Sequence, residues 1–225
     1  MCFHYALTAK AKKSSSRYRQ IKEDFSFLHA NGFENPKMPV ILDSNQQELS
    51  FLDWGLIPSW IKSAKEANTM KIKTLNARIE TISTKASFKE SIEHTRCLVL
   101  ASGFYEYHHF EGKMYPYFIS LKNEELFSFA GIWSTWLNND TSKRINSFSI
   151  VTTIANEIVA KVHNNPKKSK EPRMPIILTK EKEALWLNRT SDCLNSFQKP
   201  LSSIFMKAKL IKKIGGLNNQ PELFA

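Results

Sequence analysis

Cys2 offers the most direct route to covalent chemistry in this sequence. Methionine before a small residue such as Cys is generally removed, which leaves an amine and a thiol on adjacent carbons of Cys2. The amine can form a Schiff base with an aldehyde, and the thiolate can then close a five-membered thiazolidine ring. Because the pKa values are ordinarily about 8 for an α-amine and about 8.5 for a thiol, some of each is reactive near neutral pH. The alternative is an incidental cysteine at the second position.

The segment Thr74–Thr81 contains a polar pair of a kind that binds nucleotides. Asn76 and Arg78 are two residues apart, so in an extended segment their side chains point the same way. The amide can donate to a sugar or carbonyl oxygen, and the planar guanidinium can bind a phosphate. The alternative is an ordinary turn with a surface arginine.

Two further residues could move protons. Glu106 follows a buried strand and Gly103, between two tyrosines, and an acid held near an amine can accept and return protons. His163 lies at the expected end of a helix, and a histidine pKa near neutrality suits proton transfer. The alternatives are an exposed glutamate at a strand end and a capping or surface histidine.

The charge balance favours a polyanionic partner. Lys and Arg total 32 against 21 Asp and Glu, which gives a net charge of +11 and a pI near 9.5. Neutralised phosphates release counterions and so add affinity, although a basic surface can also serve solubility alone. The basic run at residues 10–22 is either a solvated helix face or a phosphate-facing patch. Single-stranded sites pair basic residues with stacking aromatics, of which we expect one or two here to contact a base. The aromatic residues beside the motifs are Trp54, Trp60, Trp133, Trp136, Phe104 and Tyr105.

Several function classes are disfavoured. Cys2, Cys97 and Cys193 are odd in number and widely spaced, which argues against a disulfide framework, and no Cys/His cluster indicates zinc. We expect no metal and no cofactor. Neither a signal peptide nor an apolar run long enough for a membrane span is evident. The sequence therefore predicts a cytoplasmic protein.

Many short strands with scattered helices predict a single α+β domain with a mostly antiparallel, barrel-like sheet and peripheral helices. The expected strands are residues 3–8, 40–42, 51–57, 96–101, 115–121, 126–133, 148–153 and 174–178. The hydrophobic spacing predicts helices from about Ser14 to His29, after Pro58, and over residues 88–94, 155–162 and 181–187. We expect residues 115–121 and 126–133 to form a hairpin. The domain is predicted to span residues 1–214, with a C-terminal tail at residues 215–225.

The motifs, taken in order, resemble the SOS-response-associated peptidase (SRAP) family of abasic-site processing proteins. The resemblance spans about residues 1–187. Its elements are Met1-Cys2, the Trp54–Trp60 segment, Asn76-Ala77-Arg78 with Glu80-Thr81, Gly103-Phe104-Tyr105-Glu106, Ala130–Trp133, Thr152-Thr153 with Ala155-Asn156, His163 and Arg173-Met174-Pro175.

The resemblance implies that Cys2 forms a thiazolidine with the ring-opened sugar of an abasic site in single-stranded DNA, which shields the lesion. It implies that Asn76 holds the sugar or the Cys2 backbone, that Glu106 positions and deprotonates the amine, and that His163 shuttles protons. Autoproteolytic removal of Met1, abasic-site lyase activity and slow reversal are the related activities implied. We predict a monomer that is nucleoid-associated when bound to DNA. The expected DNA-binding residues are Arg78, Trp54, Trp60, Arg173 and His4.

This sequence departs from the family pattern at several positions. The family commonly begins Met-Cys-Gly-Arg, whereas Phe3 and His4 follow Cys2 here. Leu100, Ser102 and Tyr107 stand where Pro, Asp and Trp are usual, and a longer basic loop separates His163 from Arg173. Since the four reactive positions are retained, we predict changes in DNA contacts rather than a loss of chemistry.

Overall fold

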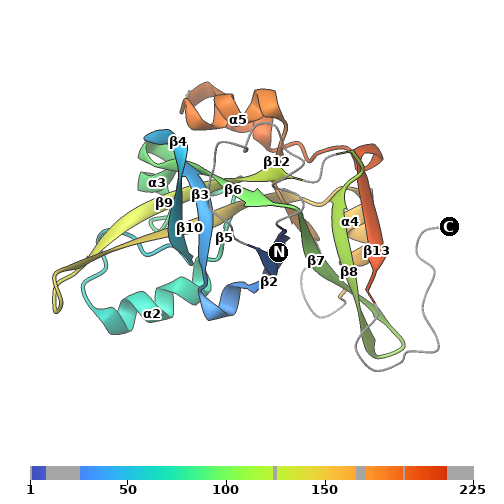
Figure 1. Ribbon diagram of the computed structural model, residues 1–225, viewed down its shortest axis with the longest axis horizontal. Helices are drawn as coiled ribbons and strands as arrows, with labels where there is room; N and C mark the ends of the chain where they lie inside the picture. The colour runs from blue at the N-terminus through green and yellow to red at the C-terminus, as the bar shows by residue number, and fades with distance from the viewer. Residues whose placement is uncertain (1, 9–25, 124–125, 166–170, 190, 212–225) are drawn as a thin grey trace.

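The computed structural model describes residues 2–8, 26–123, 126–165, 171–189 and 191–211, which form a single α+β domain (Figure 1). Two sheets carry the core, and the helices lie around them. This architecture confirms the predicted fold class, including the barrel-like sheet.

Five strands of the larger sheet close into a barrel. Their order around the ring is β10-β4-β3-β6-β9, and β9 pairs again with β10. Only the contact between β10 and β4 is parallel in this ring. Closure leaves no unpaired edge among these strands. The ring strands are β3 (Lys37–Leu42), β4 (Asn45–Trp54), β6 (Arg96–Ala101), β9 (Phe127–Asn138) and β10 (Lys143–Ile154).

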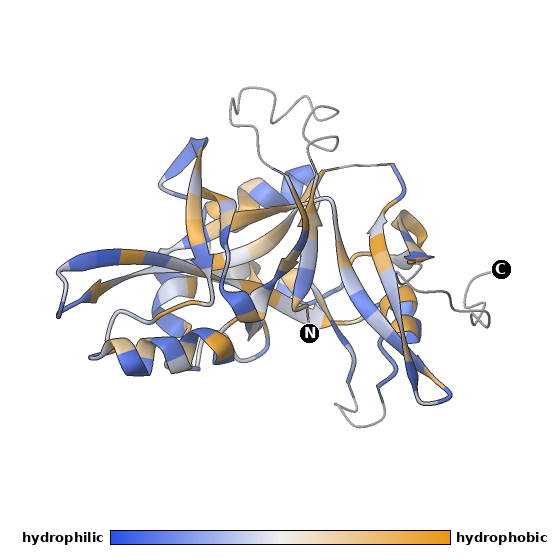
Figure 2. Cartoon of the chain, turned by 60° about the horizontal axis from the view of Figure 1, so that its bottom comes forward, coloured by the Kyte–Doolittle hydropathy of each residue, from blue (hydrophilic) through white to orange (hydrophobic). Residues whose placement is uncertain are grey.

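Three short strands extend this sheet, and two of them carry family motifs. β5 (Asn76–Arg78) runs parallel to β10, and β11 (Arg173–Pro175) pairs antiparallel with the same strand. β12 (Ile177–Leu178) pairs with β9. The β9–β10 hairpin continues beyond the barrel, where its residues become hydrophilic (Figure 2).

The second sheet is antiparallel and has the order β13-β8-β7-β1-β2. Its strands are β1 (His4–Leu7), β2 (Phe27–Asn31), β7 (Gly103–Phe110), β8 (Lys113–Leu121) and β13 (Met206–Leu210). The largest apolar cluster, which includes Tyr5, Trp54 and Phe129, draws its members from both sheets. Cys2 belongs to this cluster, so the N-terminal segment is part of the core.

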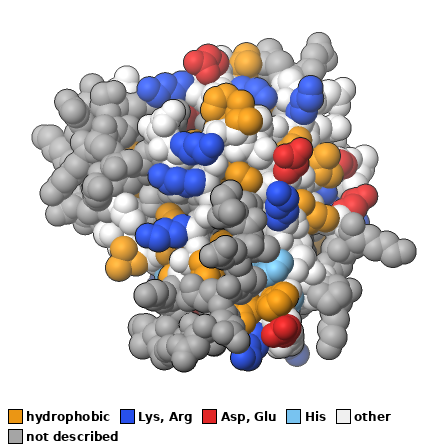
Figure 3. All heavy atoms as spheres, turned by 90° about the vertical axis from the view of Figure 1, so that its right-hand side faces the viewer, with side chains coloured by type: hydrophobic (Ala, Val, Ile, Leu, Met, Phe, Trp, Pro, Cys, Tyr) orange, Lys and Arg blue, Asp and Glu red, His pale blue; other side chains and the backbone are white. Residues whose placement is uncertain are grey.

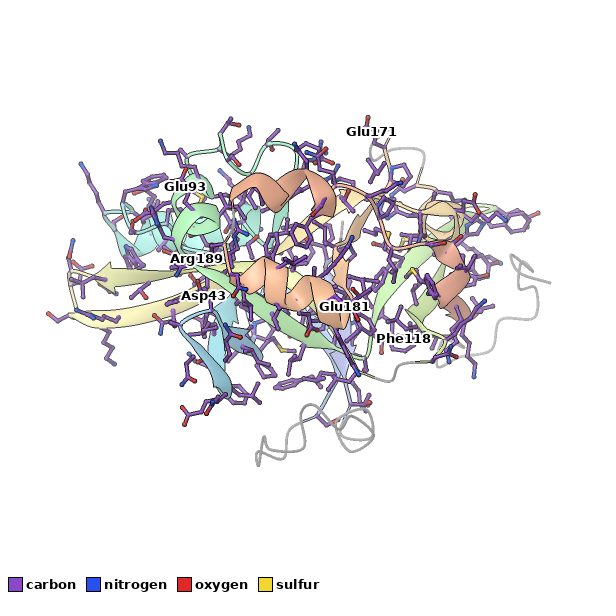
Figure 4. The ribbon with its side chains drawn as sticks, turned by 90° about the horizontal axis from the view of Figure 1, so that it is seen from above. Asp43, Glu93, Phe118, Glu171, Glu181 and Arg189 are labelled. Carbon is purple, nitrogen blue, oxygen red and sulfur yellow. The ribbon has the colours of Figure 1, made fainter. Side chains whose placement is uncertain are left out.

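The helices are short and are fixed by caps and buried side chains. The Ser63 hydroxyl caps α2 (Ala64–Lys73), and the Asn156 amide oxygen caps α4 (Glu157–Val162) by accepting from the Val159 N–H. Trp186 of α5 (Lys180–Leu187) donates its indole N–H to carbonyls of β6 and β9. Among the described residues, the remaining helical segments are α3 (Lys89–His94) and the 3₁₀ turns Gly32–Glu34, Ser191–Phe197 and Ser203–Phe205. Beyond α5, Arg189 contacts the buried carboxylate of Asp43 (Figure 4).

Most predicted elements are found, but the end of one helix and one hairpin were predicted wrongly. Phe27–His29, expected in a helix, lie in β2, because this segment pairs with β1. The predicted hairpin of residues 115–121 and 126–133 does not form: β8 pairs with β7 and β13, whereas β9 belongs to the barrel. The strand predicted over residues 51–57 begins earlier and ends at Trp54. The basic segment 10–22, most of the helix predicted from Ser14 and the tail 215–225 lie outside the described residues.

Candidate functional site

Cys2 is held by its backbone at the start of β1. The side-chain amide of Asn76 donates to the Cys2 carbonyl oxygen at 2.8 Å, and the Gly32 N–H donates to the Phe3 carbonyl at 2.9 Å. The Cys2 residue is 0% exposed. The Asn76 amide oxygen is buried and has no hydrogen-bond partner within the described structure. It can therefore still accept a hydrogen bond. The predicted contact between Asn76 and the Cys2 backbone is therefore present.

Glu106 and His163 form a close pair. Glu106 points from β7 toward the interior, His163 directly follows α4, and Nδ1 of the ring lies 2.7 Å from the carboxylate. The two side chains are 7% and 18% exposed. An ionised carboxylate only accepts hydrogen bonds, so Nδ1 must carry the proton. In the neutral ring, Nε2 is then left free to accept a proton.

Burial raises the pKa of the Cys2 thiol well above its usual range, and the negative charge of Glu106 raises it further. The thiol donates a weak hydrogen bond to the His4 carbonyl oxygen, at 3.7 Å. At neutral pH the site therefore holds a protonated Cys2 thiol. The thiazolidine closure expected from the sequence needs a base that removes this proton.

We expect alkylation of Cys2 by iodoacetamide to keep accelerating above about pH 9, where an ordinary thiol with a pKa of about 8.5 is already mostly thiolate. The raised pKa keeps Cys2 protonated through that range, so each further rise in pH adds reactive thiolate. Mass spectrometry of the N-terminal peptide across a pH series measures the rate. An unfolded peptide of the same sequence is the control, and a plateau shared by both would contradict the expectation.

Two residues that the sequence did not single out tie the end of α4 to β7. The Asn164 side chain accepts from the His109 N–H at 2.7 Å and donates to the His109 carbonyl at 2.9 Å. The His108 ring donates from Nδ1 to the Lys161 carbonyl at 3.0 Å, which leaves Nε2 to accept from Asn164 at 3.4 Å. Since His163 lies between Lys161 and Asn164, these bonds fix the backbone that carries it. The only sequence signal was the polar residue after His163.

Asn164→Ala should slow any reaction that uses His163 by about ten- to a hundredfold, the cost of misplacing a reacting group by roughly 1 Å. Asn164 acts here as a positioning residue. Asn164→Asp keeps the acceptor for the His109 N–H but turns an oxygen toward the His109 carbonyl in place of the amide donor, so it should be slowed as well. Single-turnover rates at saturating DNA measure the effect, and thermal melting and affinity for undamaged DNA should stay close to those of the wild type. Equal losses in rate and affinity would instead indicate a general structural role.

Three of the predicted DNA-binding residues are accessible. Arg78 is exposed on β5, two residues from Asn76. Trp60 is 47% exposed and His4 is half-buried on β1. Arg78 and His4 each lie two residues from a reactive position, Asn76 and Cys2, whereas Trp60 donates to the Ala86 carbonyl.

Trp54 and Arg173 do not support the direct DNA contacts predicted for them. Trp54 is 0% exposed and donates its indole N–H to the Leu75 carbonyl at 2.9 Å, so it positions the chain directly before Asn76. Arg173 is 2% exposed and donates to Thr152 and, at 2.7 Å, to the Glu80 carboxylate. Both residues were assigned from side-chain type, which does not reveal burial.

Gly55 explains why a tryptophan-glycine pair occurs in this motif. It adopts a φ of +120°, and a Cβ there would lie 2.7 Å from the Lys71 carbonyl oxygen. A larger residue would push α2 away from β4. The Trp54–Trp60 motif therefore serves mainly to place α2 and the segment that enters β5.

The part of the chain that the structure describes contains no group of three or more His, Cys, Asp or Glu side chains suited to a metal ion. Within the same residues, no helix is long and apolar enough to cross a membrane.

Comparison with known proteins identifies the family. A family model described as "SOS response associated peptidase (SRAP)" matches residues 1–214. The chain is 35% identical over 192 residues to abasic site processing protein YoqW of Bacillus subtilis, which covers 83% of this chain and 80% of that protein. It is 33% identical over 155 residues to abasic site processing protein HMCES of Gallus gallus, with 60% and 44% covered. A crystal structure of a Bacteroides thetaiotaomicron protein superposes with a TM-score of 0.84 at 37% identity, covering 94% of this chain and 92% of that one. The chain belongs to the SOS response associated peptidase (SRAP) family.

Proposed function

We propose that this protein processes abasic sites in single-stranded DNA by capturing their aldehyde on Cys2. The relatives named above are abasic site processing proteins, and the strongly basic chain suits a DNA substrate. We base the covalent step above all on the bond between Asn76 and the Cys2 carbonyl, with Glu106 and His163 paired close by.

The reaction begins after removal of Met1, when the Cys2 amine attacks the aldehyde of the ring-opened sugar. Loss of one water gives a Schiff base. The Cys2 sulfur then adds to the imine carbon, its proton leaves, and the imine nitrogen gains a proton. The product is a thiazolidine, and the sum of the steps joins an aldehyde, an amine and a thiol with the release of one water.

The chain supplies a group for each proton. Glu106 accepts from the Cys2 ammonium, whose pKa is ordinarily near 8, and thereby frees the amine. His163, through Nε2, exchanges protons with the sugar oxygen as the sugar ring opens and as water leaves. In thiazolidine closure it takes the thiol proton and returns a proton to the imine nitrogen. Asn76 fixes Cys2 by donating to the Cys2 carbonyl oxygen. The amide oxygen of Asn76 can accept a hydrogen bond from the Cys2 amine or a sugar hydroxyl.

Arg78 and His4, each two residues from a reactive position, are proposed to contact the DNA, Arg78 at a phosphate and His4 at a base, with Trp60 as a further candidate for stacking. A guanidinium holds phosphate tightly at any pH, whereas a histidine does so only when protonated. We therefore expect Arg78 to provide the more constant phosphate contact.

Two related activities follow from the same groups. Removal of Met1 by the protein itself would expose the Cys2 amine, although a general aminopeptidase would give the same product. The Schiff base also permits elimination at the sugar, which is abasic-site lyase chemistry. Mass spectrometry of the purified protein tests the first requirement, because a retained Met1 blocks the amine.

The test of the proposal is incubation of the protein with single-stranded DNA containing one abasic site, followed by denaturing electrophoresis. A DNA–protein band that survives denaturation supports capture. Salt-sensitive binding without such a band would indicate the competing function, a non-covalent module for single-stranded DNA.

A further inference from the structure

The outer face of the second sheet carries a group of rings that the covalent chemistry does not use. Along β7, Glu106 and His108 point inward, toward His163 and α4. Tyr105 and Tyr107 alternate with them and therefore point outward. The strand register places His4 on this outward side, and His29 stacks on it from β2.

Five rings from four strands follow one another in contact across this face. The centroids of His4 and His29 lie 4.9 Å apart with the rings nearly parallel, at 15°. The ring centroids of Tyr107 and His4 lie 6.0 Å apart, and those of Tyr105 and His29 lie 5.1 Å apart. The centroid of Phe118, in β8, lies 5.0 Å from that of Tyr105. All five are at least partly exposed, so the run is a surface rather than a core.

Gly103 lets the last ring lie close to the sheet. A Cβ at Gly103 would come within 2.2 Å of the Phe118 ring, so only glycine leaves the space that this ring fills. Seen from above, Phe118 lies on the opposite side of the molecule from Glu171 (Figure 4). The aromatic surface therefore reaches from β2 to β8.

Lysines continue this surface at the edge strand. In the register of β13 with β8, Lys209 pairs with Phe118 and Lys207 pairs with Ser120. Both lysines therefore lie on the outward side, and both are exposed. On the side of the molecule where β13 lies, basic side chains gather beside hydrophobic ones (Figure 3). Among the described residues of these paired strands, no outward-facing position is Asp or Glu.

His4 acts mainly as a ring rather than as a charge. Burial lowers the pKa of His4, and the neighbouring His29 lowers it further. Glu34, held by Asn31 at the sheet edge, acts against this shift, as does Glu106. At neutral pH His4 is therefore an uncharged plane suited to stacking, and the positive charge is supplied by the lysines.

We propose that this face, formed by His4, His29, Tyr105, Tyr107 and Phe118 with Lys207 and Lys209, binds the unpaired bases of single-stranded DNA next to the captured nucleotide. Hereafter it is called the aromatic face. Surfaces that bind single strands combine stacking rings with cations that follow the backbone, and this face has both. His4 is two residues from Cys2, so the face begins at the reactive site. The choice of DNA as partner rests on the proposed function.

Binding of an oligothymidylate of about 16 nucleotides without any lesion tests this face, in a Cys2→Ser background that cannot form the thiazolidine. Tyr107→Leu and His29→Leu should each weaken binding about tenfold, which is the loss of roughly one stacked base. Tyr107→Phe and His29→Phe keep a ring and should bind as the background protein does. Lys209→Gln should lower the slope of log affinity against log salt by about one.

A base analogue gives a readout independent of affinity. A 2-aminopurine in the oligonucleotide should lose fluorescence on binding to the background protein, and less so with the two leucine variants. The aromatic face is overturned if both leucine variants bind and quench as the background does, or if the phenylalanine variants lose as much as the leucine variants. Lys209 is exposed, so its substitution tests the face even if a leucine variant fails to fold.

The two proposals fail in different ways. If the wild-type chain forms no adduct with abasic DNA while the leucine variants lose oligothymidylate binding, the capture mechanism is wrong and the aromatic face stands. If the adduct forms and the leucine substitutions change neither binding nor the capture rate from dilute DNA, the aromatic face alone is wrong.

Discussion

Cys2→Ala should abolish the adduct that survives denaturing electrophoresis when the protein is incubated with single-stranded DNA carrying an abasic site. The substitution removes the sulfur that closes the thiazolidine ring but retains the α-amine, so only a hydrolysable Schiff base can form. Reduction with borohydride should therefore trap a DNA complex with the variant, although none is seen without the reductant. The two measurements together separate the role of the thiol from that of the amine.

Cys97→Ala is the matched control for the Cys2 substitution. Cys97 is also a free, buried cysteine whose pKa is raised, but it lies in β6 against Gly131. Its loss should leave the adduct intact. A stable adduct that persists in Cys2→Ala, or one that disappears in a correctly folded Cys97→Ala protein, would assign the chemistry to another residue.

Glu106→Gln should slow adduct formation about a hundredfold or more, the usual contribution of a general acid or base. Glutamine is close in size to glutamate, but it cannot take a proton from the Cys2 ammonium. It also removes the negative charge that orients the His163 ring at 2.7 Å. Single-turnover rates at saturating abasic DNA measure the effect, and affinity for undamaged DNA should change little because Glu106 is only 5% exposed.

Glu111→Gln serves as the control for this substitution, since Glu111 is exposed in the turn that follows β7. It changes the net charge by the same amount and should leave the rate unaltered. Parallel losses of rate and DNA affinity in Glu106→Gln would contradict a proton-transfer role. They would point instead to a collapse of the pocket around the buried pair.

The sequence predicted an element well where burial sets its hydrophobic pattern. It predicted poorly where the structure depends on which strands pair. Arg96–Ala101 is an apolar run that became β6 with the predicted bounds, because a strand in the barrel wall is buried on both faces. The segment of β7 alternates between inward and outward residues, but its inward positions include Glu106 and His108, so the hydrophobic pattern is weak. The partners of β8 and β9 depend on contacts distant in sequence, which periodicity does not encode.

The candidate site shows the same division. The order of motifs supplied Cys2, Asn76, Glu106 and His163, whereas their spacing in the chain gave no reason to expect them together. Trp54 and Arg173 were placed on the DNA side because their types suit nucleic acid, yet both are buried and hold the backbone that supports the site. Asn164 was missed because its contacts are with the backbone of a strand more than fifty residues away.

The reactive residues are divided between the two sheets. Asn76 lies in β5, which pairs with the barrel strand β10. Cys2 directly precedes β1, and Glu106 lies in β7, both strands of the second sheet. Proteins open in cooperative units as well as globally, and an opening between the two sheets would uncover part of the apolar cluster that they share. A partial separation there would break the Asn76–Cys2 bond while each sheet kept its own hydrogen bonds. Heat inactivation of capture should then precede the loss of β-structure, so the chemistry reports whether the two halves of the molecule are docked.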